Sequence, residues 1–147
     1  MSGEATIGWA RGEEQLRAAF TLREDVFYGE QGVPREEDHD ELDDEAQHLV
    51  ALDPDGRVIG TLRLLDFGAE AKIGRVVVAA DRRHRGIASR MLAIALARAR
   101  EQGFARVRLA AQIRAMEVYA QAGFAVESEP FEEAGIPHVW MGLTLGG

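Results

Sequence analysis

The sequence predicts one mixed α/β domain, residues 1–147, in which helices flank a single sheet of six or seven strands. Two observations carry this prediction. Short β-branched runs recur along the chain, and three intervening segments have the composition and apolar spacing of helices. No repeat or linker interrupts the chain, and 147 residues are enough to bury one core without disulfides.

The expected strands are bounded by turn residues and rich in Val, Ile and Leu. An Asp-Pro-Asp-Gly turn at 53–56 joins the second and third as an antiparallel hairpin, and we expect 72–79 to be a central buried strand. The strand-like segments are 6–9, 48–52, 58–65, 72–79, 106–110, 124–127 and 138–145.

Three segments have helical patterns. The first starts at Glu13, uses Leu16, Phe20, Val26 and Phe27 as apolar contacts, and is broken by Gly29, Gly32 and Pro34. The second, 86–102, contains no proline and ends at Gly103; the third is 113–121. The expected core-facing stripe of the second helix is Ile87, Met91, Ile94 and Ala95.

Composition excludes several classes of function. Without cysteines the chain can form neither a disulfide nor a thiolate nucleophile, and no EF-hand spacing occurs, so we expect no metal. No segment is long and apolar enough to span a bilayer, and the net charge of −8 disfavours nucleic acid or an anionic membrane as partner. We expect a cytoplasmic protein; a homodimer is compatible with the sequence.

Charge is distributed unevenly. Nine acidic residues lie between Glu30 and Glu45, with Arg35 the one formal cation there, whereas six cations and one acid lie between Lys72 and Met91. The acidic segment could line the entrance for a cationic amine or be solvated surface; the sequence does not decide between these readings.

The basic segment contains a possible phosphate-binding turn between a strand and a helix. Its sequence from Arg83 is Arg-His-Arg-Gly-Ile-Ala-Ser. The small residues Gly86 and Ala88 would let phosphates reach the unpaired amides of the helix start, and Arg83 and Arg85 would add positive charge. A solvated turn is the alternative, while a Walker loop and a dinucleotide-binding Gly-x-Gly-x-x-Gly motif are both absent.

A second motif follows at 109–124, where Ala115, Val118 and Tyr119 precede a Gly123-Phe124 turn. Together the two motifs resemble those of the GNAT N-acetyltransferase family. The flanking segments 30–34 and 134–138 resemble its ElaA-like and YjcF-like branch. The chain departs from the common family pattern at Ala88, where glycine is frequent, and at Gln112, where asparagine is frequent.

The resemblance implies a mostly antiparallel, twisted sheet with a V-shaped split at its central strands, where the pantetheine arm of acetyl-CoA binds. The implied acceptor is a primary amine of a small molecule or a protein. The residues expected to contact the acceptor are Glu30, Gln31 and His138. The implied cofactor contacts are Val76, Val77, Val78, Arg83, His84, Arg85, Gly86, Ile87, Ala88, Ser89, Gln112 and Tyr119.

Direct attack by an amine on acetyl-CoA in a ternary complex needs a neutral nucleophile, stabilisation of the thioester oxygen and a proton for the thiolate. The resemblance assigns the proton to Tyr119, which could alternatively be a packed helical tyrosine, and the oxygen to a backbone N–H near Val78. The base stays open among His48, His138 and the carboxylates near Glu30.

Two other classes of function remain. A non-catalytic module could bind acyl-CoA as a sensor, or bind a protein through the acidic segment. An RNA-binding arginine loop is the third reading, and the acidic composition argues against it.

Overall fold

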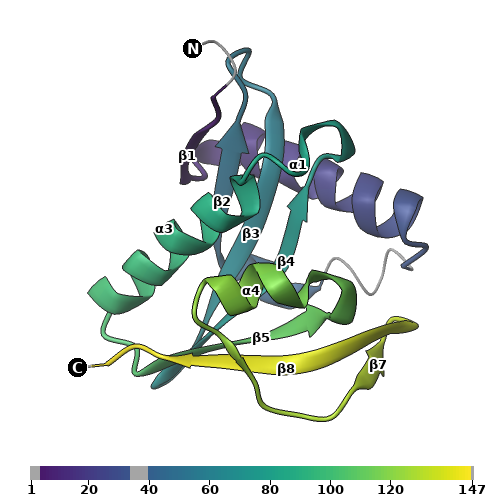
Figure 1. The fold of residues 1–147 in the computed structure, drawn as a ribbon. Helices are drawn as coiled ribbons and strands as arrows, with labels where there is room; N and C mark the ends of the chain where they lie inside the picture. Colours follow the sequence, from purple (N-terminus) through teal and green to yellow (C-terminus); the bar gives the residue numbers. More distant parts are fainter. Residues whose placement is uncertain (1–3, 34–39, 147) are drawn as a thin grey trace.

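The computed structural model describes residues 4–33 and 40–146, and its elements follow the predicted order (Figure 1). The strands are β1 (Thr6–Trp9), β2 (Gln47–Leu52), β3 (Val58–Phe67), β4 (Glu70–Val78), β5 (Arg106–Gln112), β6 (Ala125–Val126), β7 (Phe131–Glu133) and β8 (Ile136–Thr144). The α-helices are α1 (Gly12–Arg23), α3 (Ile87–Glu101) and α4 (Met116–Gln121). A π-helix, η1 (Glu24–Glu30), continues α1, and the 3₁₀ turns are η2 (Glu41–Asp44), η3 (Ala80–Arg82) and η4 (Ile113–Ala115).

The described strands form one sheet in the order β1-β2-β3-β4-β5-β8-β6, with β7 paired to β8. Every pairing is antiparallel except that of β4 with β5, so the expected mixed, mostly antiparallel sheet is confirmed. The sheet has eight strands, one more than the upper expectation. The strand without a sequence prediction is β7, whose three residues join β8 through a tight turn with positive φ at Ala134 and Gly135.

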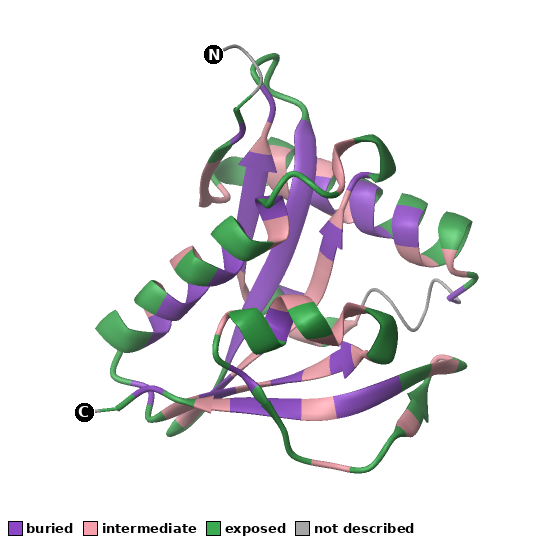
Figure 2. Ribbon diagram, viewed as in Figure 1, coloured by how far each residue is buried: buried purple, intermediate pink, exposed green. Residues whose placement is uncertain are grey.

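Helices cover both faces of the twisted sheet. Figure 1 shows α1 on one face and α3 with α4 on the other, while β5 and β8 run crosswise to β2 and β3. The predicted stripe of α3 is confirmed, because Ile87, Met91 and Ala95 are buried and Ile94 packs against the core. Figure 2 shows the buried stripe of α3 facing the sheet and its exposed residues facing outward.

The prediction that 72–79 forms a central strand is confirmed by β4, but the strand is only half buried. In β4, buried residues such as Ala71, Ile73 and Val77 alternate with half-buried ones such as Lys72. The fully buried strand is β3, whose first eight residues are all buried. α3 contacts both strands, but α1 contacts β3 more extensively than β4, and part of β4 borders a gap in the sheet.

That gap is the predicted V-shaped split. The parallel pairing of β4 with β5 runs from Glu70–Arg106 to Lys72–Arg108 and ends there, although both strands continue. A β-bulge opposite β3 lies at the same level, where Gly74 pairs with Arg63 and Arg75 has a φ of 54°. Bulges bend a strand and increase its twist, so this one accounts for the separation of the two strands.

Candidate functional site

The amino end of α3 is open to solvent. Gly86 caps it in the left-handed conformation, with φ 78°, and no side chain bonds to the cap. The first backbone bond of the helix is donated by the Arg90 N–H to the Gly86 carbonyl at 3.0 Å. The amides of Ile87, Ala88 and Ser89 precede that bond and have no acceptor within the helix, so with the helix dipole they can bind an anion.

Gly86 is needed for a further reason that sequence reasoning did not give. A Cβ built on Gly86 meets no atom within 4 Å, so no neighbouring group excludes a side chain at this position. The restriction comes from the backbone, because a φ of 78° is costly for a residue with a side chain. His84 has positive φ as well, and with Arg85 it is exposed at this turn.

Arg83 is engaged by protein groups. Its Nη1 and Nη2 donate to the Glu30 carboxylate at 2.8 and 2.9 Å, and its Nε donates to the Val78 carbonyl at 2.9 Å. This pairing lowers the pKa of Glu30 below its usual value. Arg83 therefore links the end of η1 to the turn, and its positive charge is compensated by Glu30.

The gap between β4 and β5 brings several predicted residues together. On β4, Val76–Val78 lie beyond the last pair with β5, so their edge toward β5 is open. On the other side Gln112 ends β5, and its Nε2 donates to Oε1 of Gln31 at 3.0 Å. The end of η1 thus reaches both sides of the gap, through Glu30 to the turn and through Gln31 to β5.

Tyr119 lies on α4, which follows the end of β5. Its side chain is 8% exposed and makes an edge contact with the ring of Phe124, with centroids 6.3 Å apart. Burial raises the pKa of the phenol to about 12. The hydroxyl therefore stays protonated at neutral pH and can donate a hydrogen bond or a proton.

His138 and His48 differ in position. His138 pairs with Gln112 across β5 and β8, and its Nδ1 lies 2.6 Å from the Ile136 carbonyl. That contact assigns the proton to Nδ1 and leaves Nε2, 4.0 Å from the Glu133 carboxylate, as the basic nitrogen. His138 therefore lies beside the end of β5 on the neighbouring strand β8, and its side chain is buried.

The structure does not bring His48 to this gap, contrary to its expected place among the candidate bases. His48 pairs with Arg63 of β3, which in turn pairs with Gly74, so two strand spacings separate it from β4. Its Nε2 bonds to the Asp43 carbonyl at 2.9 Å and its ring packs edge-on against Phe20. Burial lowers the pKa of His48, so it is a neutral, packed side chain.

In the described part of the acidic segment, Glu30, Asp40 and Asp43 pair with arginines from elsewhere in the chain. Asp43 bonds Arg23 at 2.8 Å and Arg63 at 2.9 Å, and Asp40 bonds Arg63 at 2.7 Å. Burial opposes ionisation of Asp43, and the two arginines outweigh it and lower its pKa to about 2. These carboxylates neutralise arginines under α1; Pro34 and residues 35–39 lie outside the described residues.

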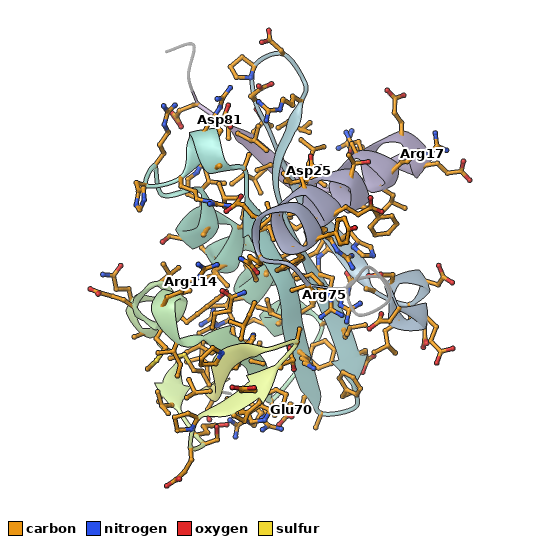
Figure 3. All side chains as sticks on the ribbon, turned by 90° about the vertical axis from the view of Figure 1, so that its right-hand side faces the viewer. Arg17, Asp25, Glu70, Arg75, Asp81 and Arg114 are labelled. Atoms are coloured by element: carbon orange, nitrogen blue, oxygen red, sulfur yellow. The ribbon has the colours of Figure 1, made fainter. Side chains whose placement is uncertain are left out.

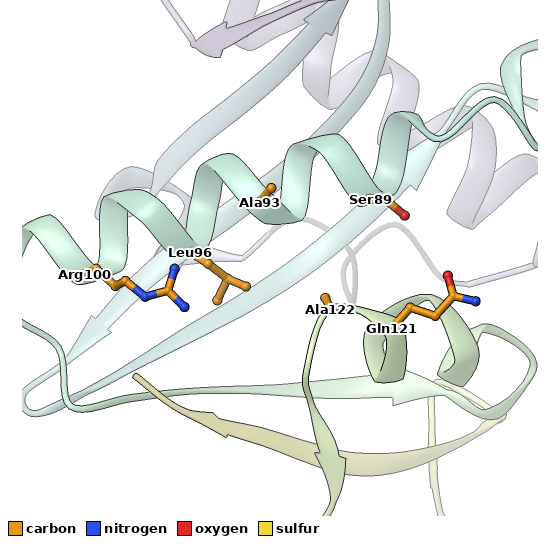
Figure 4. Close-up of a pocket in the computed structure, with 6 residues that line it drawn as sticks. All are labelled: Ser89, Ala93, Leu96, Arg100, Gln121 and Ala122. Atoms are coloured by element: carbon orange, nitrogen blue, oxygen red, sulfur yellow. The ribbon is translucent and has the colours of Figure 1, made fainter. Parts of the chain in front are cut away.

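A groove of about 460 Å³ begins beside the open helix end. Figure 4 shows Ser89, Ala93, Leu96 and Arg100 of α3 on one side and Gln121 and Ala122 at the end of α4 on the other. Ser89 belongs both to the groove and to the open end of α3. In the described residues no group of three His, Cys, Asp or Glu side chains could hold a metal, and no helix is long and apolar enough to cross a membrane.

A mixed sheet that splits beside a solvent-open helix end is the arrangement of the GNAT acyltransferase fold. Residues 12–145 match the family model described as acetyltransferase (GNAT) domain, so the chain belongs to the GNAT acetyltransferase family. The uncharacterized N-acetyltransferase YjcF of Bacillus subtilis (strain 168) is 38% identical over 134 residues, 90% of this chain and 94% of YjcF.

Two solved structures agree. An acyl-CoA N-acyltransferase from Pseudomonas aeruginosa has a TM-score of 0.82 and 32% identity, covering 96% of this chain and 99% of its own. Escherichia coli ElaA has a TM-score of 0.83 and 26% identity, covering 95% and 98%. The resemblance to the ElaA-like and YjcF-like branch is confirmed.

Sequence reasoning missed Lys72, Arg108 and Trp140, which meet where β4 and β5 separate. Lys72 Nζ lies 5.1 Å and Arg108 Cζ 4.6 Å from the centroid of the Trp140 ring. The available signal was a lysine at the start of a strand rich in valine and isoleucine.

Proposed function

We propose that this GNAT-family protein transfers the acetyl group of acetyl-CoA to a primary amine within a ternary complex. The observation that carries the proposal is the gap between β4 and β5, which ends next to the open amino terminus of α3. One extended ligand with a pyrophosphate at one end can use both features, because its phosphates meet the helix amides and its amide-containing arm pairs with the open edge of β4.

The protein groups support this assignment. The amides of Ile87, Ala88 and Ser89 hold the phosphates, with Arg85 and His84 exposed beside them. The arm extends along Val76–Val78, where a backbone N–H donates to the thioester oxygen. The fold has been seen with this ligand elsewhere: yncA of Salmonella typhimurium, 16% identical, was solved with its cofactor acetyl-CoA.

The reaction then needs few protein groups. The neutral amine forms a bond to the acetyl carbon, the carbon–sulfur bond breaks, the sulfur takes a proton from Tyr119, and the amine loses one. We assign that last proton to Nε2 of His138, directly or through water, because this nitrogen has no closer described contact than the Glu133 carboxylate at 4.0 Å. Gln31 and Glu30 border the acceptor side of the gap, linked to Gln112 and Arg83.

The direct test is calorimetric titration with acetyl-CoA, with dephospho-CoA and NAD as comparison ligands, followed by an amine screen that detects released CoA. We expect micromolar, selective binding of acetyl-CoA and acetylation of at least one amine. Binding without turnover of any amine would support the acyl-CoA sensor instead, and absence of binding would contradict the proposal.

A further inference from the structure

One face of the sheet is left partly open beside α1. His48 and Arg63 lie under α1, since His48 packs against Phe20 of that helix. Alternation along the strands places Lys72 on the same face as Arg63, and Lys72 pairs with Arg108 of β5. On this face β5 and β8 present half-buried side chains, and α1 contacts β2, β3 and β4 but makes no comparable contact with the described residues of β5 or β8.

Aromatic rings form a wall on this face. The ring of Phe131 stacks on His138 at 6.0 Å and on Trp140 at 5.7 Å, both within about 26° of parallel. Lys72 and Arg108 project over the ring of Trp140. Val76, beside the proposed acetyl position, is four residues beyond Lys72 along β4, roughly 13 Å of extended strand.

The cations of this face differ in their partners. Arg63 and Arg75 each contact the Asp40 carboxylate, at 2.7 and 3.4 Å. Arg108 lies 3.5 Å from Glu70 and 3.6 Å from Glu127. Figure 3 labels Glu70 at the start of β4 and Arg75 at its bulge.

Lys72, between those two labelled residues in sequence, has no carboxylate within 4.0 Å in the described parts of the chain, and its ammonium lies over the Trp140 ring. Asp40 and Glu133 act on it only from longer range, and Arg63 and Arg75 oppose them. A half-buried ammonium with no counter-ion among the described residues favours a ligand that supplies one.

We propose that the acetyl acceptor is a small amine that carries a carboxylate, and that Lys72 binds this carboxylate at the point where β4 and β5 separate. The proposal rests on the proposed acetyltransferase function and names its substrate class. The acceptor's hydrocarbon part lies along the wall of Phe131 and Trp140, and its amine points toward Val76 and His138. The strand distance between Lys72 and Val76 requires several bonds between amine and carboxylate.

A polyamine, which carries further positive charge, fits this face less well. Glu30, Asp40 and Asp43 are bound to arginines and are therefore compensated before any acceptor arrives. A second cation placed near Lys72 would be repelled, whereas a carboxylate would be attracted.

The test compares amines that differ only in the carboxylate. With acetyl-CoA as donor, kcat/KM is measured for 4-aminobutyrate, 6-aminohexanoate and lysine, against propylamine, pentylamine and the diamine cadaverine. The variants are Lys72→Gln, Lys72→Arg, and Arg17→Gln as a control for charge on the outer surface of α1, where Arg17 is 75% exposed (Figure 3). Thermal unfolding and acetyl-CoA affinity are measured for each.

We expect the wild type to prefer an amine with a carboxylate at least about tenfold over its matched alkylamine. Lys72→Gln should remove that preference and leave the alkylamine rate within about threefold, while Lys72→Arg and Arg17→Gln should keep it. A preference that survives Lys72→Gln, or equal losses for both amines, would overturn the role of Lys72.

Other results separate the two proposals. If acetyl-CoA binds and the wild type prefers cadaverine or acetylates none of these amines, the inference fails while the cofactor site stands. If acetyl-CoA does not bind at all, the proposed function fails, and the inference with it.

Discussion

Arg83 and Glu30, 53 positions apart in the chain, form a bidentate ion pair that joins the proposed phosphate-binding turn to the end of η1. The same arginine holds the Val78 carbonyl through Nε. This geometry means that a phosphate reaching Arg83 must compete with a carboxylate already in place. A residue assigned from sequence as a free positive charge is therefore part of a link between the two sides of the proposed site.

We predict that Glu30→Gln tightens acetyl-CoA binding, because it frees Arg83 to contact the phosphates. The gain should be at most about fivefold, since an exposed ion pair contributes little free energy. Calorimetry at low and high salt measures the effect, which should shrink as salt screens the phosphates. Glu24→Gln, the same change at an exposed residue of η1, is the control and should leave affinity unchanged. Weaker binding in Glu30→Gln would mean that the pair holds the turn in its binding conformation.

Tyr119→Phe should lower kcat by about a hundredfold and leave the Kd for acetyl-CoA within about twofold, because it removes a proton donor and keeps the ring. The pKa of about 12 also predicts that Tyr119 causes no loss of rate up to about pH 10. Tyr28→Phe, at a side chain 50% exposed, is the matched control. An unchanged kcat in Tyr119→Phe would assign that side chain to packing.

Gly86→Ala should cost about 1 to 2 kcal/mol of unfolding free energy, since its φ of 78° disfavours a side chain, and should weaken acetyl-CoA binding as well. Gly56→Ala in the β2–β3 turn has the same backbone problem, with φ 86° and no atom within 4 Å of the added Cβ. We expect similar losses of stability and an effect on affinity only at Gly86. Equal acetyl-CoA affinities of Gly86→Ala and Gly56→Ala would contradict the assignment of the phosphates to the turn at Gly86.

Asp43 should make stability fall in acid. Its folded pKa of about 2 lies below the ordinary value of 3.8, so its contribution is complete above about pH 4 and disappears as the pH falls toward 2. The difference corresponds to about 2 kcal/mol of unfolding free energy. Denaturant unfolding between pH 2 and 5 should show this loss.

Two variants, Asp43→Asn and its control Asp44→Asn, test whether Asp43 causes this loss of stability in acid. Asp43→Asn should be less stable at neutral pH by about 3 kcal/mol, because Arg23 and Arg63 stay buried, and it should depend less on pH. Asp44 is exposed, and its variant should behave like the wild type. If Asp43→Asn does not fold, an NMR titration of the Asp43 carboxyl in the wild type reads the pKa directly, and a value near 4 would refute the assignment.

Much of the fold was accessible from local pattern. The helix at 86–102 was predicted within a residue of α3 at each end, because an apolar stripe, the absence of proline and flanking glycines are all local features. The turn at 53–56 was predicted for the same reason: the Asp53 side chain accepts from the amides of Asp55 and Arg57. The strand β7 was missed, since three residues are too few for a period-2 pattern.

The residue types of the proposed cofactor site, from Val76 to Ser89 with Tyr119, follow from sequence motifs, because a strand, a basic turn and a helix start are contiguous in the chain. The sequence motifs do not determine which charged side chains at this site are free to bind a ligand. Glu30 compensates Arg83, Asp43 compensates Arg23 and Arg63, and Lys72 is left without a described carboxylate partner through contacts between segments 20 or more residues apart. Such contacts depend on sheet order, the bulge at Arg75 and the face on which each side chain lies, and these are properties of the folded chain as a whole.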